Sequence, residues 1–312
     1  MPAGNSPVAL SRASPLDRLA LYFAGEPTRQ GILARAALGR PAHGDAELAR
    51  RWIERSGAEL RSDGSARGTS VTTIWRAHEM LDLGASPDAA PLDRVLRWVL
   101  ELQGRPGAFG EGCDRERHGR RLCEHFVLGF FAPAPPLQRL APVTLPNGKI
   151  YRAESAARFA SSCLALRAAL RSGHRDRRVV RQHVTSLVCL ADQWTTWTGY
   201  FSPDLIIAAL HALAHAGPER GEVVERLSSL AAAHQDRDGL WPNADLFHVL
   251  DALLAAGTQA GLAAVRRAVP ALAARQRPDG AFGTTAQQER ALIALRAMRW
   301  AHEGQEPRRA PS

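Results

Sequence analysis

Two copies of one pattern of apolar positions lie in the C-terminal half of the chain. In the first copy, two apolar stripes within residues 223–254 flank a turn at Asp238-Gly239. In the second, two stripes within residues 262–298 flank Asp279-Gly280. Apolar residues that recur every three or four positions indicate an amphipathic helix. Each copy therefore predicts a hairpin of two helices joined by an Asp-Gly turn.

Weaker copies of this hairpin extend the pattern upstream. Helical stripes over residues 71–83, 154–170 and 205–216 each follow a turn. The turns recur at intervals of about 40–50 residues, the period of a helical-repeat protein. Few β-branched runs interrupt the Ala- and Leu-rich stretches, which also favours helix over strand. The six turn glycines are Gly64, Gly107, Gly148, Gly199, Gly239 and Gly280, and they predict six hairpins.

Three of the turns share a local motif. Residues 103–109, 235–241 and 276–282 each begin with Gln and end with an aromatic residue. Glycine permits the turn, Gln can bond free backbone groups at helix ends, and the aromatic ring can fill the gap between successive outer helices. This motif therefore has a structural role.

These repeats resemble those of the terpenoid cyclase and protein prenyltransferase superfamily, and in particular the Gln-and-aromatic repeat of squalene-hopene cyclases. The resemblance implies an all-α fold, an α/α toroid in which an inner ring of helices is surrounded by an outer ring. An open helical solenoid is the alternative that the repeat itself allows. We expect an N-terminal extension with a first helix over residues 1–44, the toroid over 45–302 and a disordered tail over 303–312.

Length and composition indicate the size of the core and the cellular compartment of this domain. The chain has 312 residues, 45% of them hydrophobic, which is enough for one substantial core. No run approaches the ~20 apolar residues of a transmembrane helix, and the N-terminus lacks the pattern of a signal peptide. We therefore expect a cytoplasmic protein whose four cysteines are thiols.

The charge of the chain points to an anionic small molecule rather than to nucleic acid. Forty Lys and Arg residues against 31 Asp and Glu give a net charge of +9, and most of the cations are Arg. Arg binds carboxylate and phosphate groups in a bidentate manner. The charge is spread along the chain without a nucleic-acid-binding motif, so no nucleic-acid partner is expected.

Catalytic candidates lie where inner helices begin, next to the mouth of the toroid's cavity. Asp204 and Asp245 are single carboxylates that follow aromatic residues, and His248 lies one helical turn after Asp245. We expect the three side chains to open into one pocket, with Asp204 or Asp245 as acid or ligand and His248 as base or ligand. The alternative is that both carboxylates are helix N-caps and His248 is a satisfied helical histidine. The Asp-x-Asp-Asp acid motif of type II terpene cyclases is absent from the sequence.

Further candidates serve ligand binding. Aromatic rings stabilise cations, so one aromatic group is expected to line an apolar cavity, although wedging between helices is the alternative. This group is Trp194, Trp197, Tyr200 and Phe201. The resemblance to isoprenoid enzymes implies arginines that hold a diphosphate at the mouth. Their candidates are Arg117, Arg120, Arg121 and Arg158.

One segment carries four residues of the types that bind zinc. Thiolate and imidazole are preferred zinc ligands, but the spacing here matches no standard zinc motif, and an Arg-rich surface loop is the alternative. The four residues are Cys113, His118, Cys123 and His125. The segment 245–248 also resembles the region that supplies a zinc-binding histidine in protein prenyltransferases. The sequence identifies no cofactor, and Zn²⁺ and Mg²⁺ are the candidates.

The resemblance favours an isoprenoid-handling enzyme, similar to a terpene cyclase or prenyltransferase, with an apolar central cavity. Its expected partner is a hydrophobic small molecule, with an isoprenoid diphosphate as a candidate. One alternative is a non-catalytic toroid that binds a hydrophobic ligand or a protein. Another is a carbohydrate-active α/α toroid, which requires two carboxylates facing each other across an open cleft.

Overall fold

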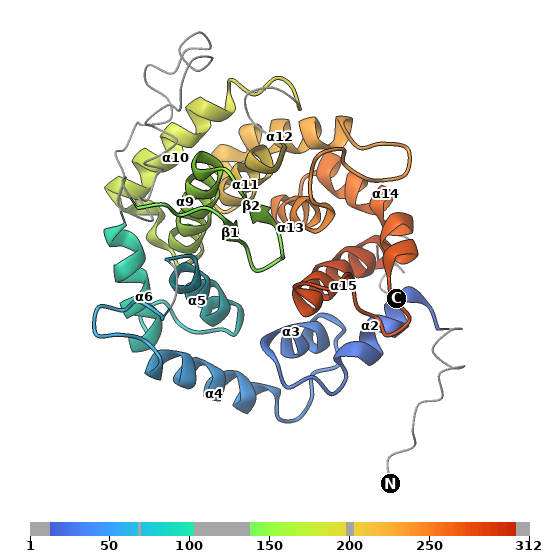
Figure 1. The fold of residues 1–312 in the computed structure, drawn as a ribbon, viewed down its shortest axis with the longest axis horizontal. Coiled ribbons are helices and arrows are strands. Elements are labelled where there is room, and N and C mark those ends of the chain that lie inside the picture. The colour runs from blue at the N-terminus through green and yellow to red at the C-terminus, as the bar shows by residue number, and fades with distance from the viewer. Residues whose placement is uncertain (1–12, 68–69, 103–137, 198–202, 304–312) are drawn as a thin grey trace, which may run out of the picture.

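A computed structural model describes residues 13–67, 70–102, 138–197 and 203–303. Within these residues two concentric rings of α-helices surround one axis, and the chain alternates between an outer and an inner helix (Figure 1). The outer ring consists of α2 (Pro15–Phe23), α4 (Asp45–Ala58), α6 (Ala90–Glu101), α10 (Arg178–Ala191), α12 (Gly221–Ala233) and α14 (Gln259–Arg275). The inner ring consists of α3 (Arg29–Ala37), α5 (Ser70–Asp82), α9 (Glu154–Arg171), α11 (Pro203–Leu213), α13 (Leu246–Ala256) and α15 (Gln287–Glu303). The predicted all-α toroid is confirmed.

The two rings differ in how much of each helix is buried. The outer helix α6 buries one stripe, formed by Leu92, Val95, Leu96 and Val99. Every residue of the inner helix α11 is buried. An outer helix packs on one side and meets water on the other, whereas an inner helix is surrounded by neighbours. The hydrophobic core therefore lies between the two rings.

The turn after α12 shows how the repeat motif holds neighbouring outer helices together. Gln235 donates from Nε2 to the carbonyl of Ala264 on α14 (2.9 Å), and its Oε1 accepts from Nε of Arg267 (2.8 Å). The indole N–H of Trp241 donates to the carbonyl of Ala231 (2.8 Å), and its ring is buried. The motif thus links a hairpin to the next outer helix, in agreement with its predicted structural role.

The equivalent turn after α14 closes the ring. Gln276 donates from Nε2 to the carbonyl of Pro15 on α2 (3.1 Å), and its Oε1 accepts from Nε of Arg18 (3.0 Å). Helix α15 also packs against α2 and α3. The turn after α14 therefore bonds to α2 in the same way that the turn after α12 bonds to α14. The ring is closed, which excludes the open solenoid.

The structure differs from the predicted repeat at Gly148 and at the start of the ring. Gly107 and Gly148 both fall between α6 and α9; Gly107 lies outside the described residues, and Gly148 (φ +85°) is in the turn of a β-hairpin. The strands of this hairpin are β1 (Val143–Thr144) and β2 (Ile150–Tyr151). The sixth helical pair is instead α2–α3, so the toroid begins before residue 45. The tail over 304–312 lies outside the described residues. Within the described part of the chain, no helix is long and apolar enough to cross a bilayer.

Candidate functional site

The β1–β2 hairpin lies over the centre of the inner ring (Figure 1). Its antiparallel register pairs Val143 with Tyr151 and Thr144 with Ile150. The side chain of Asn147 accepts from the backbone N–H of Lys149 (3.1 Å), which stabilises the turn that Gly148 permits. The hairpin tip therefore covers one end of the space enclosed by the inner helices.

A buried histidine of α13 connects the hairpin to two inner helices. His248 is 3% exposed, and its Nδ1 lies 3.1 Å from the Asn147 amide nitrogen. Its Nε2 lies 3.1 Å from the hydroxyl of Tyr151, which donates to the carbonyl oxygen of Asp204 (3.0 Å). Burial lowers the pKa of His248 and raises that of Tyr151 well above its usual value. A neutral His248 with its proton on Nε2 satisfies every group in this network.

Ion pairs surround this histidine network. The carboxylate of Asp204 pairs with Lys149 of the hairpin and also accepts from the backbone N–H of Asp245 (3.1 Å). Asp245 is the N-cap of α13, since its Oδ1 accepts from the N–H groups of Phe247 (3.0 Å) and His248 (3.1 Å). Its other oxygen lies 3.3 Å from Arg290, whose Nε donates to the carbonyl of Asn147 (3.0 Å). These bonds hold the hairpin tip against the starts of three inner helices.

The structure thus brings Asp204, Asp245 and His248 together at one rim, although the sequence analysis expected all three to open into one pocket. Of the three, His248 contributes to the lining of the central cavity. Both carboxylates are instead paired with cations and backbone N–H groups, as expected of carboxylates with a structural role.

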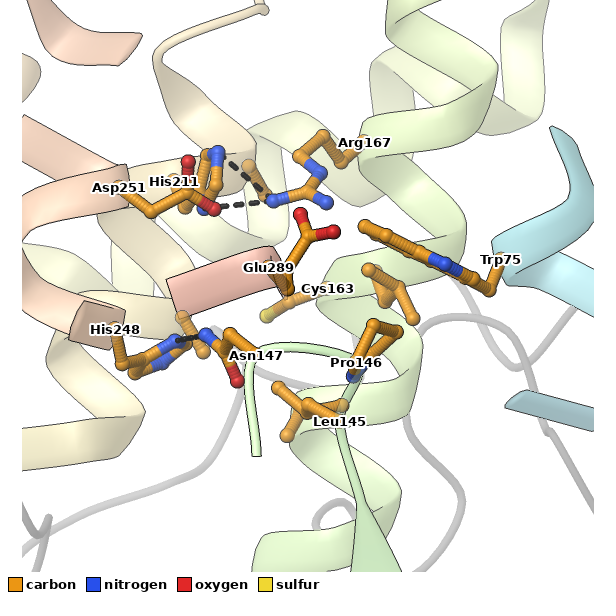
Figure 2. A pocket seen from close by; sticks show the side chains of 14 residues that line it. Trp75, Leu145, Pro146, Asn147, Cys163, Arg167, His211, His248, Asp251 and Glu289 are labelled. Carbon is orange, nitrogen blue, oxygen red and sulfur yellow. Dashed lines mark hydrogen bonds and ion pairs between the residues drawn. The ribbon is translucent and has the colours of Figure 1, made fainter. Parts of the chain in front are cut away.

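The space on the ring axis is a narrow cavity of about 30 Å³. Figure 2 shows its lining residues, which come from the hairpin tip and from five inner helices. The apolar part of the wall consists of Leu145, Pro146, Ala160, Cys163, Leu164, Ala208 and Ala212. Burial raises the pKa of Cys163, so this thiol remains protonated.

Charged and polar side chains occupy the middle of the cavity. Nη1 of Arg167 lies 2.7 and 2.8 Å from the two ring nitrogens of His211, and Asp251 lies 3.8 Å from His211 Nδ1 (Figure 2). Burial, reinforced by the charge of Arg167, holds the pKa of His211 well below its usual value, so the ring accepts a hydrogen bond from Arg167. Burial also lowers the pKa of Arg167 to about 10, which leaves the guanidinium charged at neutral pH.

The opposite wall of the cavity contains a second group of charges. Glu289 of α15 accepts three hydrogen bonds from Arg29 of α3 (2.9, 3.1 and 3.1 Å). Arg29 also lies 3.3 Å from Asp82 of α5, and its guanidinium lies 5.1 Å from the ring centre of Trp75. Glu289 is thus neutralised, while Trp75 presents an aromatic face to the cavity.

A second cavity of about 320 Å³ continues on the far side of these charged residues. It shares Trp75, Arg167, His211, Asp251 and Glu289 with the first, and its other lining residues lie near the C-terminal ends of inner helices. The charged cluster therefore lies between a space covered by the hairpin and one at the opposite rim. Charged side chains therefore reach the axis of a cavity whose wall is otherwise largely apolar, because residues of five inner helices meet there.

Several predicted ligand-binding residues face away from the cavity or lie outside the described residues. Trp197 stacks on His234 (5.6 Å), Trp194 packs edge-on against Phe159 (6.4 Å), and both indoles are buried between helices. Arg158 is fully buried, pairs with Glu154 and donates to the carbonyl of Gln138. The predicted residues outside the described ranges are Cys113, Arg117, His118, Arg120, Arg121, Cys123, His125, Tyr200 and Phe201. In the described ranges, no group of three His, Cys, Asp or Glu residues has the arrangement of a metal site, so the zinc prediction stays untested.

The sequence analysis missed the residues that define the cavity. Trp75, Arg167, His211 and Asp251 lie within inner helices rather than at their starts. A signal was present, since a charged or imidazole side chain inside an otherwise apolar helix is unusual. Arg167 interrupts the apolar part of α9, His211 that of α11 and Asp251 that of α13.

Comparison with known proteins supports the fold. The chain matches no protein-family model and no curated protein sequence. Its structure resembles that of the type II terpene cyclase MstE from Scytonema, solved in complex with geranylgeranyl dihydroxybenzoate. One MstE variant has a TM-score of 0.53 at 14% identity, with 91% of this chain and 87% of MstE covered. A second variant has a TM-score of 0.53 at 12% identity, with coverages of 95% and 97%.

This likeness extends over nearly the whole chain. The protein therefore has the fold of a type II terpene cyclase.

Proposed function

We propose that this chain is an isoprenoid-handling enzyme, which binds a prenylated molecule along the ring axis, across the two adjoining cavities, and cyclises it. The observation that carries the proposal is the cavity itself, because it combines a small-residue apolar wall with Trp75 and the carboxyl group of Asp251. MstE, which has the same fold, was solved with a prenylated substrate.

The proposed reaction begins with proton transfer. Asp251 donates its carboxylic proton to one carbon of an alkene, and the other carbon becomes a cation. The π electrons of a second alkene then form a new carbon–carbon bond to that cation. A neighbouring carbon then returns a proton to the Asp251 carboxylate, which restores a double bond and regenerates the acid, so the product is a cyclic isomer of the substrate. The face of Trp75 stabilises the cation in the cavity.

Asp251 is the preferred proton donor because of its partners. A carboxyl group that protonates an alkene must itself hold a proton, and a paired cation opposes this. Glu289 is paired with Arg29, Asp204 with Lys149 and Asp245 with Arg290. In the described residues Asp251 has no Lys or Arg within ion-pair distance; it lies 3.8 Å from His211 and interacts with the charge of Arg167 at longer range.

The residues at the rim have a positioning role in this proposal. Asp204, Asp245 and His248 hold the β1–β2 hairpin over the cavity and so exclude water from the cation. Water would otherwise capture a carbocation before ring closure, which makes closure of the cavity part of the mechanism.

The test is incubation of the purified protein with geranylgeranyl dihydroxybenzoate, followed by chromatography and mass spectrometry. The expected product has the mass of the substrate and a different retention time. Asp251→Asn should lower turnover at least about 100-fold, the usual contribution of a positioned general acid. Asp192→Asn, which changes an exposed carboxylate, serves as the matched control. Equal turnover by wild type and Asp251→Asn would rule out this residue as the acid.

A non-catalytic toroid that holds a hydrophobic ligand is the second candidate, favoured by the absence of an Asp-x-Asp-Asp motif from the sequence. Calorimetric binding of the same compound without any product would support this candidate. The absence of both binding and turnover would count against both candidate functions.

A further inference from the structure

A surface groove lies beside α10, a helix of the outer ring (Figure 1). Its lining comes mainly from α10 and from two short 3₁₀ helices, η1 (His174–Asp176) and η2 (Pro218–Arg220). These short helices follow the C-terminal ends of α9 and α11, so the groove lies at the rim opposite the β1–β2 hairpin. It encloses about 610 Å³ and shares no lining residue with either cavity on the ring axis. The groove is therefore a candidate site that the proposed reaction does not use.

Positive charge without a partner collects in this groove. Two carboxylates line it, Asp176 and Glu219, against four arginines, so two positive charges remain. The side chains of these arginines make no ion pair or hydrogen bond with any other described residue; they are Arg175, Arg178, Arg181 and Arg220. Clustered guanidinium groups repel one another, and an anion bound among them removes that repulsion.

Arg220 indicates where a hydrogen-bond acceptor of the ligand would lie. Its Nε is buried and has no acceptor among the described residues, whereas nearly all buried N–H donors of folded proteins have one. The neighbouring carboxylate of Glu219 does not supply it, because that carboxylate lies back against Gly217. A Cβ added to Gly217 would be 2.5 Å from its Oε2. An oxygen atom of a bound anion can therefore satisfy this donor.

The start of α10 strengthens the positive potential of the groove. Its N-cap residue, Arg177, makes no side-chain cap hydrogen bond, and the first turn contains no acidic residue. Helix α12, which packs beside α10, has Glu222 in its first turn instead. The dipole and the free N–H groups at a helix start favour negative charge, so Arg178 and Arg181 place cations where they are least favourable. A bound anion offsets this effect.

The lining favours a phosphate group carried by a small molecule. Guanidinium groups bind phosphate oxygens in a bidentate manner. A phosphate monoester has a charge of about −1.5 to −2 at pH 7, which matches the two excess positive charges of the groove. The buried side chains of Leu170, Val184 and Ala216 also contribute to the lining and can contact an apolar part of the ligand. The volume lies within the range of about 300–1,000 Å³ that is typical of small-molecule sites.

A free small molecule fits this groove better than a lipid head group does. Proteins that bind a membrane surface insert apolar side chains beside their basic residues. The large apolar side chains that are exposed in the described ranges are Leu21 and Ile150, and neither lines the groove.

We propose that the groove formed by η1, α10 and η2 binds a soluble phosphate monoester, whose phosphate is held by Arg178, Arg181 and Arg220. The organic part of this ligand contacts the apolar lining residues. Because the site is separate from the ring axis, this molecule is a second ligand and not the substrate of the proposed reaction.

The experiment compares phenyl phosphate with benzoate, two probes that share an aromatic ring and differ in their anionic group. Dissociation constants of the full-length protein are measured by calorimetry in a phosphate-free buffer at about pH 7.5, where the phosphate monoester is mostly doubly charged. Wild type should bind phenyl phosphate at least about 10-fold more tightly than benzoate, because the phosphate makes additional charge-assisted hydrogen bonds.

Two variants and a control assign this binding to the groove. Arg178→Gln and Arg220→Gln should each weaken binding of phenyl phosphate about 10-fold or more, the loss expected for a hydrogen bond between charged groups. Arg178 is exposed, so its variant provides the test even if Arg220→Gln does not fold. Arg237→Gln is the matched control, since Arg237 is an exposed arginine of the turn after α12 and lies outside the groove. It should bind phenyl phosphate as wild type does.

Cys189 gives an independent reading of where the probe binds. This exposed cysteine lines the groove, whereas Cys163 is buried. Phenyl phosphate at about ten times its dissociation constant occupies most of the sites. The rate at which iodoacetamide alkylates Cys189, followed by peptide mass spectrometry, should then fall several-fold.

Each adverse outcome overturns the phosphate site. Equal binding of phenyl phosphate and benzoate by wild type would show that the groove does not select phosphate. Unchanged affinity in Arg178→Gln and Arg220→Gln, an equal loss in Arg237→Gln, or no protection of Cys189 would show that the probe binds elsewhere. Binding to vesicles of phosphatidylcholine and phosphatidic acid without binding of phenyl phosphate would identify a membrane surface instead of a soluble ligand. None of these results bears on the cavities of the ring axis, so the proposed function is tested separately.

Discussion

The buried network around His248 predicts a measurable cost for removing one hydroxyl group. Tyr151→Phe deletes the oxygen that lies 3.1 Å from Nε2 of His248 and donates to the carbonyl of Asp204 (3.0 Å). That carbonyl keeps its helical bond within α11, whereas the Nε2–H group of His248 loses its acceptor in a buried place. One unsatisfied buried donor costs about 1–3 kcal/mol, so the free energy of unfolding should fall by this amount.

The assay is urea unfolding monitored by circular dichroism, and the m-value of the variant should equal that of wild type. Tyr22→Phe is the matched control, because no hydrogen bond to the Tyr22 hydroxyl is present in the described ranges, and it should change stability by less than about 0.5 kcal/mol. Amide exchange at the β1–β2 hairpin should increase in Tyr151→Phe, since the hydroxyl links the hairpin to α11 and α13. A loss no larger than that of Tyr22→Phe would refute the assigned network.

Three further changes test the cap, the closing turn and a buried histidine. Asp245→Ala should lower the free energy of unfolding by about 0.5–2 kcal/mol. Asp245→Asn keeps the cap and loses the 3.3 Å, partly buried ion pair with Arg290, so it should lower the free energy of unfolding by less than about 1 kcal/mol. Gly280→Ala should destabilise the protein by about 1–3 kcal/mol, since Gly280 has φ +89° and a Cβ there would lie 2.7 Å from the Arg18 carbonyl oxygen. Burial lowers the pKa of His183 to about 4, so its neutral form stabilises the fold at neutral pH. That contribution decreases as pH falls from about 6.5, the unfolded value, towards 4, by at most about 3 kcal/mol.

The controls for these changes use the same unfolding assay. Gly221→Ala replaces a glycine with open space around its Cβ position, so stability should be unchanged or slightly higher. His183→Phe should have a shallower dependence of stability on pH than wild type between pH 6.5 and 4, and parallel curves would contradict the assignment. Equal losses in Asp245→Ala and Asp245→Asn would show that the ion pair, rather than the cap, dominates.

The local features of the repeat were predictable from the sequence because they depend on neighbouring residues. Helical periodicity located α5, α9 and the helices from α11 to α15 to within a few residues, and Asp-Gly placed the turns at Gly239 and Gly280. The rim residues Asp204, Asp245 and His248 were also grouped correctly, because successive hairpins repeat the same geometry. Their hydrogen-bond partners were not predicted, since Tyr151 and Asn147 come from a β-hairpin that no repeat describes.

The contents of the cavity were decided by the tertiary structure. An outer helix has one apolar stripe that reveals its buried side, but an inner helix such as α11 is buried all around, so its periodicity does not mark the side that faces the axis. Trp75, Arg167, His211 and Asp251 meet because four inner helices are rotated to point these side chains at one space. The closing contact of α15 with α2 and α3 likewise depends on how the repeats curve. The sequence by itself determined the helical hairpins and their turns. The closed ring determined which side chains meet on the axis, because their meeting depends on the rotation of helices that lie far apart in the chain.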